Sequence, residues 1–159
     1  MHHIILLVDT SRSMGNRRIE AAKEQIIDIL PTHTFFLSIV SIGNKPEVLV
    51  KHSKYQRAMI DGISEGGGVS NLGLSLSECF TLASSYKEKA SILYVGDGMS
   101  TDDYSMIRKN NSSNVNSFLA LLFSKETTYC TQLQRFEQYY SNDDDLEQLS
   151  DRLKGLTKK

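Results

Sequence analysis

The sequence predicts an α/β fold in which helices cover both faces of a doubly wound, mostly parallel central sheet. Short apolar runs such as Ile4–Val8 are typical of strands that are buried on both faces. They alternate along the chain with segments whose apolar residues recur every three or four positions, the spacing of one helix face. The chain has 159 residues, of which 40% are hydrophobic and 23% charged, and no linker divides it. This length is enough for one full core, so we expect a single domain over residues 1–159.

The first half of the chain contains three predicted strands and a clear helix. After the strand Ile4–Val8, a helix face is formed by Ile19, Ala22, Ile26, Ile29 and Leu30. Pro31 ends this helix, because proline lacks the N–H group that a helix interior needs. We then expect a strand, a short hairpin partner and a weaker helix, at Phe35–Val40, Glu47–Val50 and Tyr55–Ile63.

The second half continues the alternation of helix and strand. The glycines Gly66–Gly68 predict a loop, and a second helix face follows at Leu72, Leu76, Cys79, Phe80 and Ala83. We then expect, in order, a strand, a short helix, a loop and two strands, at Ser91–Val95, Thr101–Arg108, Lys109–Asn116, Ser117–Phe123 and Gln138–Tyr140. A terminal helix is predicted by Leu146, Leu149, Leu153 and Leu156. The acidic run Asp143–Asp145 indicates the start of that helix rather than a calcium loop.

Composition excludes several classes of function. Lysine and arginine number 18 against 19 acidic residues, and tryptophan is absent, so nucleic acid is not expected as a partner. The run Ile4–Val8 is too short for a signal sequence or a membrane span, and we expect no membrane partner. Cys79 and Cys130 lack the spacing of a metal site or a disulfide framework, which indicates reduced thiols. We therefore expect a cytoplasmic location.

Side chains that carry oxygen follow three of the predicted elements. In a parallel α/β sheet, ligands bind beyond the carboxyl ends of the strands. One group directly follows Val8, one lies in the glycine-rich loop, and one directly follows the strand Ser91–Val95. Alternating positions in the first group point its side chains the same way, so all three groups can meet at one point. The candidate metal ligands are Asp9, Ser11, Ser13, Ser70 and Asp97.

This set of donors predicts a particular chemistry. Two carboxylates and three hydroxyls form a hard, all-oxygen site, which suits Mg²⁺ or Mn²⁺ at about 2.0–2.2 Å better than zinc or copper. Two carboxylates only neutralise a divalent ion, so one coordination position is open to an Asp or Glu carboxylate of another molecule. We find no residue placed as a general base for a metal-bound water. The pattern favours metal-bridged binding over catalysis.

The same segments resemble the motifs of the von Willebrand factor A (VWA) family. Asp9–Ser13 resembles the family's Asp-x-Ser-x-Ser motif after a hydrophobic first strand. Gly67–Gly73 is similar to its Gly-Gly-Thr-Asn-Leu-Gly loop, with Ser70 in the position of threonine and one extra residue before it. Leu93–Gly98 is similar to the strand that ends in Thr-Asp-Gly, with glycine in place of threonine. The segment Phe136–Leu153 is similar to the family's closing strand and helix. The resemblance covers nearly the whole chain.

The resemblance implies a Rossmann-like fold and a metal-ion-dependent adhesion site (MIDAS). The site would map onto the five candidate ligands, and Arg12 and Asn71 beside it are candidates for contact with a partner. Family members bind protein partners, often through a partner Asp or Glu that ligates the ion. Many intracellular members work in multiprotein assemblies, with AAA+ ATPases, kinases or phosphatases. The resemblance therefore implies a binding module rather than an enzyme.

Two other functions fit part of the pattern. In a haloacid-dehalogenase-like phosphohydrolase, Asp9 would be the nucleophile and Asp97 a magnesium ligand. That family places its general acid/base Asp two residues after the nucleophile, where this chain has Ser11, and such a group contributes about 10²–10⁴-fold to the rate. The phosphohydrolase also leaves Ser13 and Ser70 unexplained. The other alternative is a scaffold of the same fold that binds its partner without metal.

Overall fold

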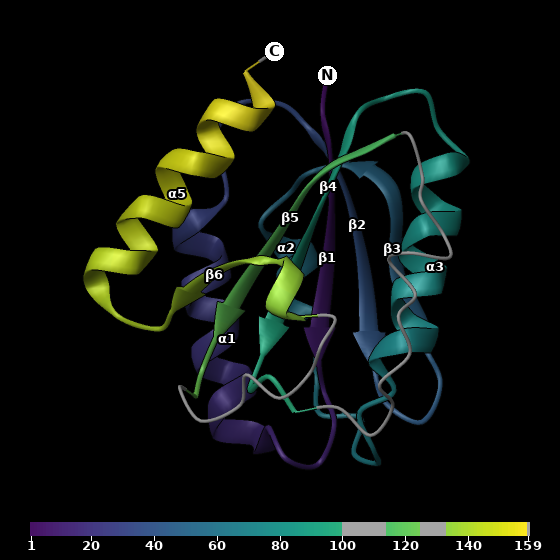
Figure 1. The fold of residues 1–159 in the computed structure, drawn as a ribbon, viewed down its shortest axis with the longest axis vertical. Coiled ribbons are helices and arrows are strands. Elements are labelled where there is room, and N and C mark those ends of the chain that lie inside the picture. Colours follow the sequence, from purple (N-terminus) through teal and green to yellow (C-terminus); the bar gives the residue numbers. More distant parts are fainter. Residues whose placement is uncertain (100–113, 125–132, 159) are drawn as a thin grey trace.

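Six strands form one sheet in the computed structural model, which describes residues 1–99, 114–124 and 133–158 (Figure 1). The strand order is β3-β2-β1-β4-β5-β6. All neighbours pair in parallel except β2 and β3, which form an antiparallel hairpin. The strands are β1 (His3–Asp9), β2 (Phe36–Ile42), β3 (Glu47–Lys54), β4 (Ala90–Gly96), β5 (Val115–Leu122) and β6 (Glu137–Tyr140). The mostly parallel sheet confirms the predicted fold class.

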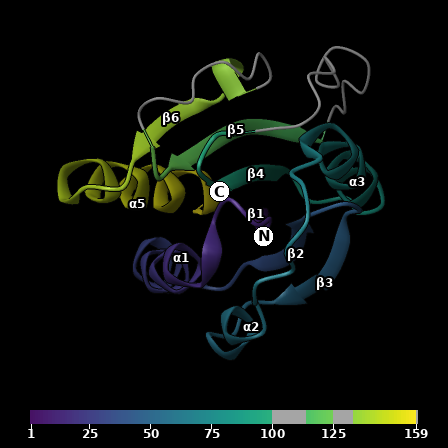
Figure 2. The ribbon, with the colours of Figure 1, turned by 90° about the horizontal axis from the view of Figure 1, so that it is seen from below.

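Helices cover the two faces of this sheet (Figure 2). They are α1 (Gly15–Ile29), α2 (Ala58–Asp61), α3 (Leu72–Ser84) and α5 (Asp143–Thr157), and a 3₁₀ turn occupies Leu133–Arg135. Helices α1, α2 and α5 lie on one face and α3 lies on the other. No helix in the described ranges is both long and apolar enough to cross a membrane.

The central strand β1 organises two cores. All seven of its residues are buried, because β2 and β4 pair with its edges and helices cover both of its faces. Its alternate side chains enter different clusters: Ile4, Leu6 and Val8 pack toward α1 and α5, whereas Ile5 and Leu7 pack toward α3. An unbroken apolar run is what this position requires, since neither face of the strand meets water.

Most of the predicted elements are confirmed, and the differences have physical reasons. Residues Val115 and Asn116, predicted as loop, begin β5, because Val115 pairs with Ala90 of β4. The weak helix predicted at Tyr55–Ile63 is reduced to the single turn α2. The strand β3 runs four residues beyond its predicted end, along the hairpin with β2. The helix predicted at Thr101–Arg108 and the thiol Cys130 lie outside the described residues.

The start of α5 is fixed by side chains, as the acidic run predicted. Asn142 is the N-cap, and its side-chain oxygen accepts a hydrogen bond of 2.9 Å from the backbone N–H of Asp145. The carboxylate of Asp145 in turn accepts from the N–H of Tyr140 at 2.6 Å, which ties the helix to β6. Three acidic residues in the first turn also interact favourably with the helix dipole.

Replacing the cap tests this account of α5. We expect Asn142→Ala to lower the free energy of unfolding by about 1 kcal/mol, because one N–H group at the helix start loses its partner. Asn142→Asp keeps the acceptor and should stay close to the wild type. Urea unfolding followed by circular dichroism measures both variants. An unchanged stability in Asn142→Ala would mean that Asp145 alone fixes the start of the helix.

Candidate metal centre

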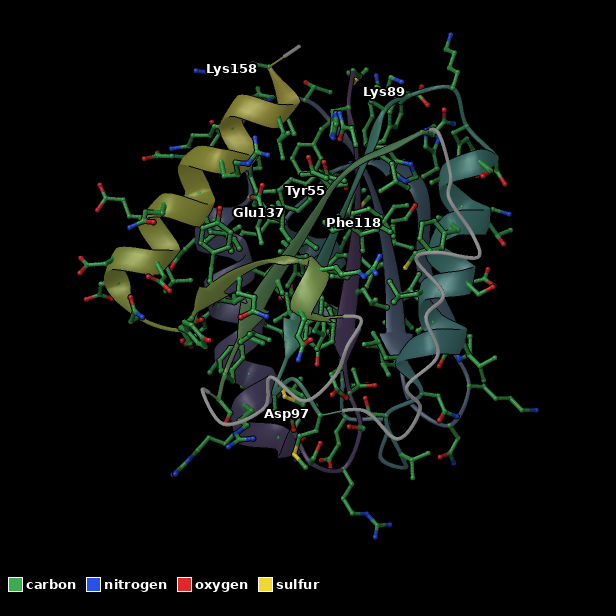
Figure 3. The ribbon with its side chains drawn as sticks, in the orientation of Figure 1. Tyr55, Lys89, Asp97, Phe118, Glu137 and Lys158 are labelled. Atoms are coloured by element: carbon green, nitrogen blue, oxygen red, sulfur yellow. The ribbon has the colours of Figure 1, made fainter. Side chains whose placement is uncertain are left out.

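The topology brings the predicted ligands to one edge of the sheet. Strands β1 and β4 are parallel neighbours, with Val8 opposite Val95, so Asp9 and Asp97 leave the sheet side by side at its carboxyl edge. Figure 3 labels Asp97 at the lower end of the sheet, where the arrows of β1 and β4 point. Both aspartates are 0% exposed. Two carboxylates are therefore buried together at the edge where α/β proteins bind ligands.

Hydrogen bonds join Asp9 to Ser11 and Ser70, and Ser11 to Ser13. Its Oδ1 accepts from the backbone N–H of Ser11 at 2.9 Å, and its Oδ2 accepts from the hydroxyl of Ser70 at 3.4 Å. The hydroxyls of Ser11 and Ser13 are 3.2 Å apart. These contacts place four of the five predicted side chains around one point, with the hydroxyl of Ser70 reaching it from the loop before α3.

Asp97 completes the group from β4. Its Oδ1 accepts a hydrogen bond of 3.0 Å from the backbone N–H of Met99. Its Oδ2 is buried and accepts no hydrogen bond from the residues that the structure describes. A cation lies nearby, because Nη1 of the Arg18 guanidinium on α1 is 3.7 Å from this oxygen. A buried carboxylate oxygen without a hydrogen bond is costly, because it has lost water and gained no donor in return.

The glycine-rich loop is held against the first loop by backbone hydrogen bonds. The N–H groups of Gly66 and Gly67 both donate to the carbonyl of Thr10 at 3.1 Å, and the N–H of Arg12 donates to the carbonyl of Gly68 at 3.0 Å. Gly68 has a φ of +77°, and a Cβ there would lie 2.7 Å from Oδ1 of Asn44. Only glycine combines this backbone conformation with so close an approach. The loop thereby brings Ser70 to Asp9.

The space around position 96 requires glycine there. A Cβ at this position would lie 2.7 Å from the Cβ of Asp9 and would overlap the hydroxyl of Tyr94. That hydroxyl accepts a hydrogen bond of 3.1 Å from the N–H of Gly98. The buried Tyr94 thus fills the space that a side chain at position 96 would need, and it supports the loop that carries Asp97.

The pKa of Asp9 reflects the electrostatics of the site. The pKa of Asp9 is raised from 3.8 to about 6, mainly by burial, and the nearby charge of Asp97 contributes in the same direction. Hydrogen bonds from Ser11 and Ser70 oppose this shift, because they stabilise the ionised form. Burial and the negative charge of Asp97 therefore both oppose the ionisation of Asp9.

The donor set fits a hard divalent ion. A cation here would meet two carboxylates and three hydroxyls, and it would satisfy the buried oxygen of Asp97. In the described part of the chain, no group of three or more His, Cys, Asp or Glu side chains is arranged to hold a metal. Hydroxyls therefore make up the rest of this site, and they favour Mg²⁺ or Mn²⁺ over softer metals.

The two candidates for contact with a partner, Arg12 and Asn71, differ in their exposure to solvent. Arg12 is exposed, as expected of a residue that contacts a partner. Asn71 is half-buried, and its side-chain N–H donates to the carbonyl of Asn44 at 2.7 Å, so it also supports the loop. Sequence reasoning missed Arg18 and Tyr94. No spacing identifies them, because one is an ordinary surface residue of a helix and the other an ordinary strand residue until the fold places them at the site.

Comparison with known proteins decides the family. Residues 4–100, more than half of the chain, match the family model described as the von Willebrand factor type A domain. The chain belongs to this family. VWA domains are protein-binding modules that are generally not catalytic, and many carry a MIDAS. The matched region contains all five predicted ligands, and the match confirms the predicted family.

Solved structures agree with this VWA assignment at the level of the fold. The chain aligns over its full length with the conserved hypothetical protein BatB from Bacteroides thetaiotaomicron, covering 100% of both chains at 11% identity and a TM-score of 0.77. It also aligns with proximal thread matrix protein 1 of the mussel byssus, at 16% identity and a TM-score of 0.75. The alignment covers 98% of this chain and 47% of the mussel protein, so the VWA chain spans about half the length of that protein. A second structure of the mussel protein has a MIDAS motif occupied by zinc, and matches at 15% identity with a TM-score of 0.71 over 98% of this chain and 45% of that one. No curated protein matches the sequence.

The shifted pKa of Asp9 predicts how stability depends on pH in the absence of metal. The pKa is about 6 in the folded protein and 3.8 without the shift, so the ionised carboxylate destabilises the fold above pH 6. This penalty disappears as the pH falls toward 4. We expect Asp9→Asn in EDTA to be more stable than the wild type at pH 8, by on the order of 2 kcal/mol, and to lose this advantage near pH 4.

The readout is the difference in free energy of unfolding between variant and wild type at each pH. The difference is needed because His2 and His3 act in the opposite direction. Burial lowers the pKa of each to about 4, so both destabilise the fold as the pH falls from 6.5. Both histidines are present in each protein, and their effect cancels. An Asp9→Asn variant less stable than the wild type at pH 8 would contradict the account.

Proposed function

We propose that this VWA domain binds a partner protein through a divalent ion. The ion is Mg²⁺ or Mn²⁺, and a partner Asp or Glu carboxylate fills its open coordination position. The residues that hold the ion are Asp9, Ser11, Ser13, Ser70 and Asp97. The observation that carries the proposal is the buried Oδ2 of Asp97, which accepts no hydrogen bond from the described residues and lies beside a second buried carboxylate.

Charge balance supports a carboxylate as the ligand that the partner supplies. The two aspartates neutralise a divalent ion but leave it electrophilic, because hydroxyl oxygens donate weakly. A further carboxylate is therefore attracted to the ion more strongly than a neutral ligand is. The surface around the centre adds a positive charge at the exposed Arg12, and no acidic residue lies in the first turn of α1. An acidic segment of a partner is complementary to this surface.

Exposed apolar side chains near the centre support a protein as the partner. Among the described residues, the exposed large hydrophobic side chains are Met1, Val69, Leu74 and Met99. Val69 directly precedes Ser70, Leu74 lies in the first turn of α3, and Met99 is two residues after Asp97. Three of the four therefore belong to the segments that build the centre. Apolar groups around a polar centre are typical of surfaces that other proteins cover.

The geometry favours a binding module over a phosphohydrolase. A phosphohydrolase of the haloacid dehalogenase type needs a general acid two residues after its nucleophile, and that position holds Ser11. The hydroxyl of Ser11 pairs with the hydroxyl of Ser13, and its N–H donates to Asp9. A serine hydroxyl is far too weak an acid to protonate a leaving group at neutral pH. The resemblance also supports an assembly with an AAA+ ATPase, a kinase or a phosphatase. The free thiol of Cys79 agrees with a reducing compartment, and therefore with a cytoplasmic location.

Metal titration tests the ligand assignment. We expect the wild type to bind Mg²⁺ or Mn²⁺ with one ion per chain, and to gain about 2.7 kcal/mol of stability when the free ion is at 100 times its dissociation constant. Asp97→Asn should abolish this binding, because half of the carboxylate charge is lost. Asp28→Asn, on the exposed face of α1, is the matched control and should bind as the wild type does. Calorimetric titration measures all three, and Asp97→Asn with unchanged affinity would contradict the assignment.

Capture of a partner tests the bridging role. We expect partner proteins from native lysate to be retained by the immobilised domain in Mg²⁺ and released by EDTA. Ser11→Ala should lose them, whereas Ser64→Ala, in an exposed loop, should retain them. A partner retained equally in EDTA and by Ser11→Ala would favour the metal-independent scaffold. Metal-dependent hydrolysis of p-nitrophenyl phosphate would favour the phosphohydrolase.

A further inference from the structure

A basic side chain lies beside Asp97 and partly balances the negative charge of the centre. Arg18 lies near the start of α1, and its Nη1 is 3.7 Å from Oδ2 of Asp97. The side chain of Arg18 is 45% exposed, whereas that of Asp97 is 1% exposed. The oxygen that Arg18 faces is the same buried oxygen that accepts no hydrogen bond from the described residues. Arg18 therefore approaches the centre from the solvent side and faces the atom that a metal ion would satisfy.

The distance shows what kind of contact this is. A guanidinium that donates to a carboxylate normally lies about 2.7–2.9 Å from the oxygen. At 3.7 Å the pair of Arg18 and Asp97 attracts by charge but does not form a hydrogen bond. Such a pair offsets part of the cost of the buried carboxylate, and it is weak because one partner is largely in water. Arg18 can leave without breaking any hydrogen bond to Asp97.

We propose that Arg18 is a resident counter-ion of Asp97 that a divalent ion must displace, and that it sets the metal affinity of the centre. The inference rests on the proposed function, since it concerns the same centre. The guanidinium stabilises Asp97 when no metal is bound. When a divalent ion approaches, the same positive charge repels it and competes for the same oxygen. The affinity is thereby lower than the five oxygen ligands alone would give.

Because of this competition, the occupancy of the centre by metal depends on whether a partner is bound. A metal that binds weakly in the free domain exchanges with its surroundings, and its occupancy then depends on a further ligand. An acidic partner that attracts the guanidinium away from Asp97 removes the competition. By thermodynamic linkage, such a partner raises the affinity for the ion by the same factor by which the ion raises the affinity for the partner.

Calorimetric titration of the chain with MgCl₂ and with MnCl₂ tests the role of Arg18. The variant is Arg18→Gln, which removes the charge and keeps a polar side chain of similar shape. The matched control is Arg17→Gln, which removes the same charge from the exposed neighbouring position. Arg18→Lys is the conservative variant, which keeps the charge. Thermal unfolding in EDTA measures the stability of each metal-free protein.

We expect Arg18→Gln to bind both ions about ten-fold more tightly than Arg17→Gln, the effect of one unit charge a few ångströms from the ion. Arg18→Lys should stay near the wild type. In EDTA, Arg18→Gln should unfold at a lower temperature than Arg17→Gln, because Asp97 has lost its counter-ion. If Arg18 only stabilised the fold, Arg18→Gln would unfold at a lower temperature but would bind the ions no more tightly.

Each other outcome is decisive. Equal affinities of Arg18→Gln and Arg17→Gln, in a wild type that binds the ion, would overturn the competition and leave the proposed function standing. Weaker binding by Arg18→Gln would also overturn it, since Arg18 would then support the metal site. Absence of binding in every protein, Arg18→Gln included, would overturn the proposed function and the competition together.

Discussion

Two buried carboxylates at one edge of a parallel sheet are the constraint on which the rest of the site depends. Asp9 ends β1, Asp97 directly follows the adjacent parallel strand β4, and both are removed from water. Burial, together with the nearby charge of Asp97, raises the pKa of Asp9 to about 6. One oxygen of Asp97 accepts no hydrogen bond from the described residues. In the described part of the chain, the loops and side chains around the two aspartates support this arrangement or offset its charge.

The supporting features come from parts of the chain that are far apart in sequence. The glycine-rich loop brings Ser70 against the first loop through its backbone hydrogen bonds to Thr10. The hydroxyl of Tyr94 occupies the space beside Gly96 and holds the loop after β4. Arg18 brings a positive charge from α1. A centre that is costly without a cation, and that offers oxygen donors alone, is suited to hold one and to share it with an acidic partner.

Local pattern predicted much of this structure, and the remainder depends on tertiary packing. The run Ile4–Val8 indicated a central strand because every residue in it must be apolar when helices cover both faces. The serine and aspartate positions followed from the strand ends, since parallel strands meet ligands at their carboxyl edge. The pair of Arg18 and Asp97 could not be predicted in this way, because it depends on how α1 docks against the sheet. The start of β5 at Val115 was missed for a similar reason, as its pairing with Ala90 decides it.

Anomalous diffraction from crystals grown with MnCl₂ is the sharpest test of the metal centre, because it locates the ion without any assumption about affinity. We expect one strong peak at the carboxyl edge of β1 and β4, among the side-chain oxygens of Asp9, Ser11, Ser13, Ser70 and Asp97. At least some of these oxygens should lie about 2.1–2.2 Å from the ion, with water completing its shell. A fully occupied manganese peak elsewhere, with none between the two aspartates, would show that these residues do not form the metal centre.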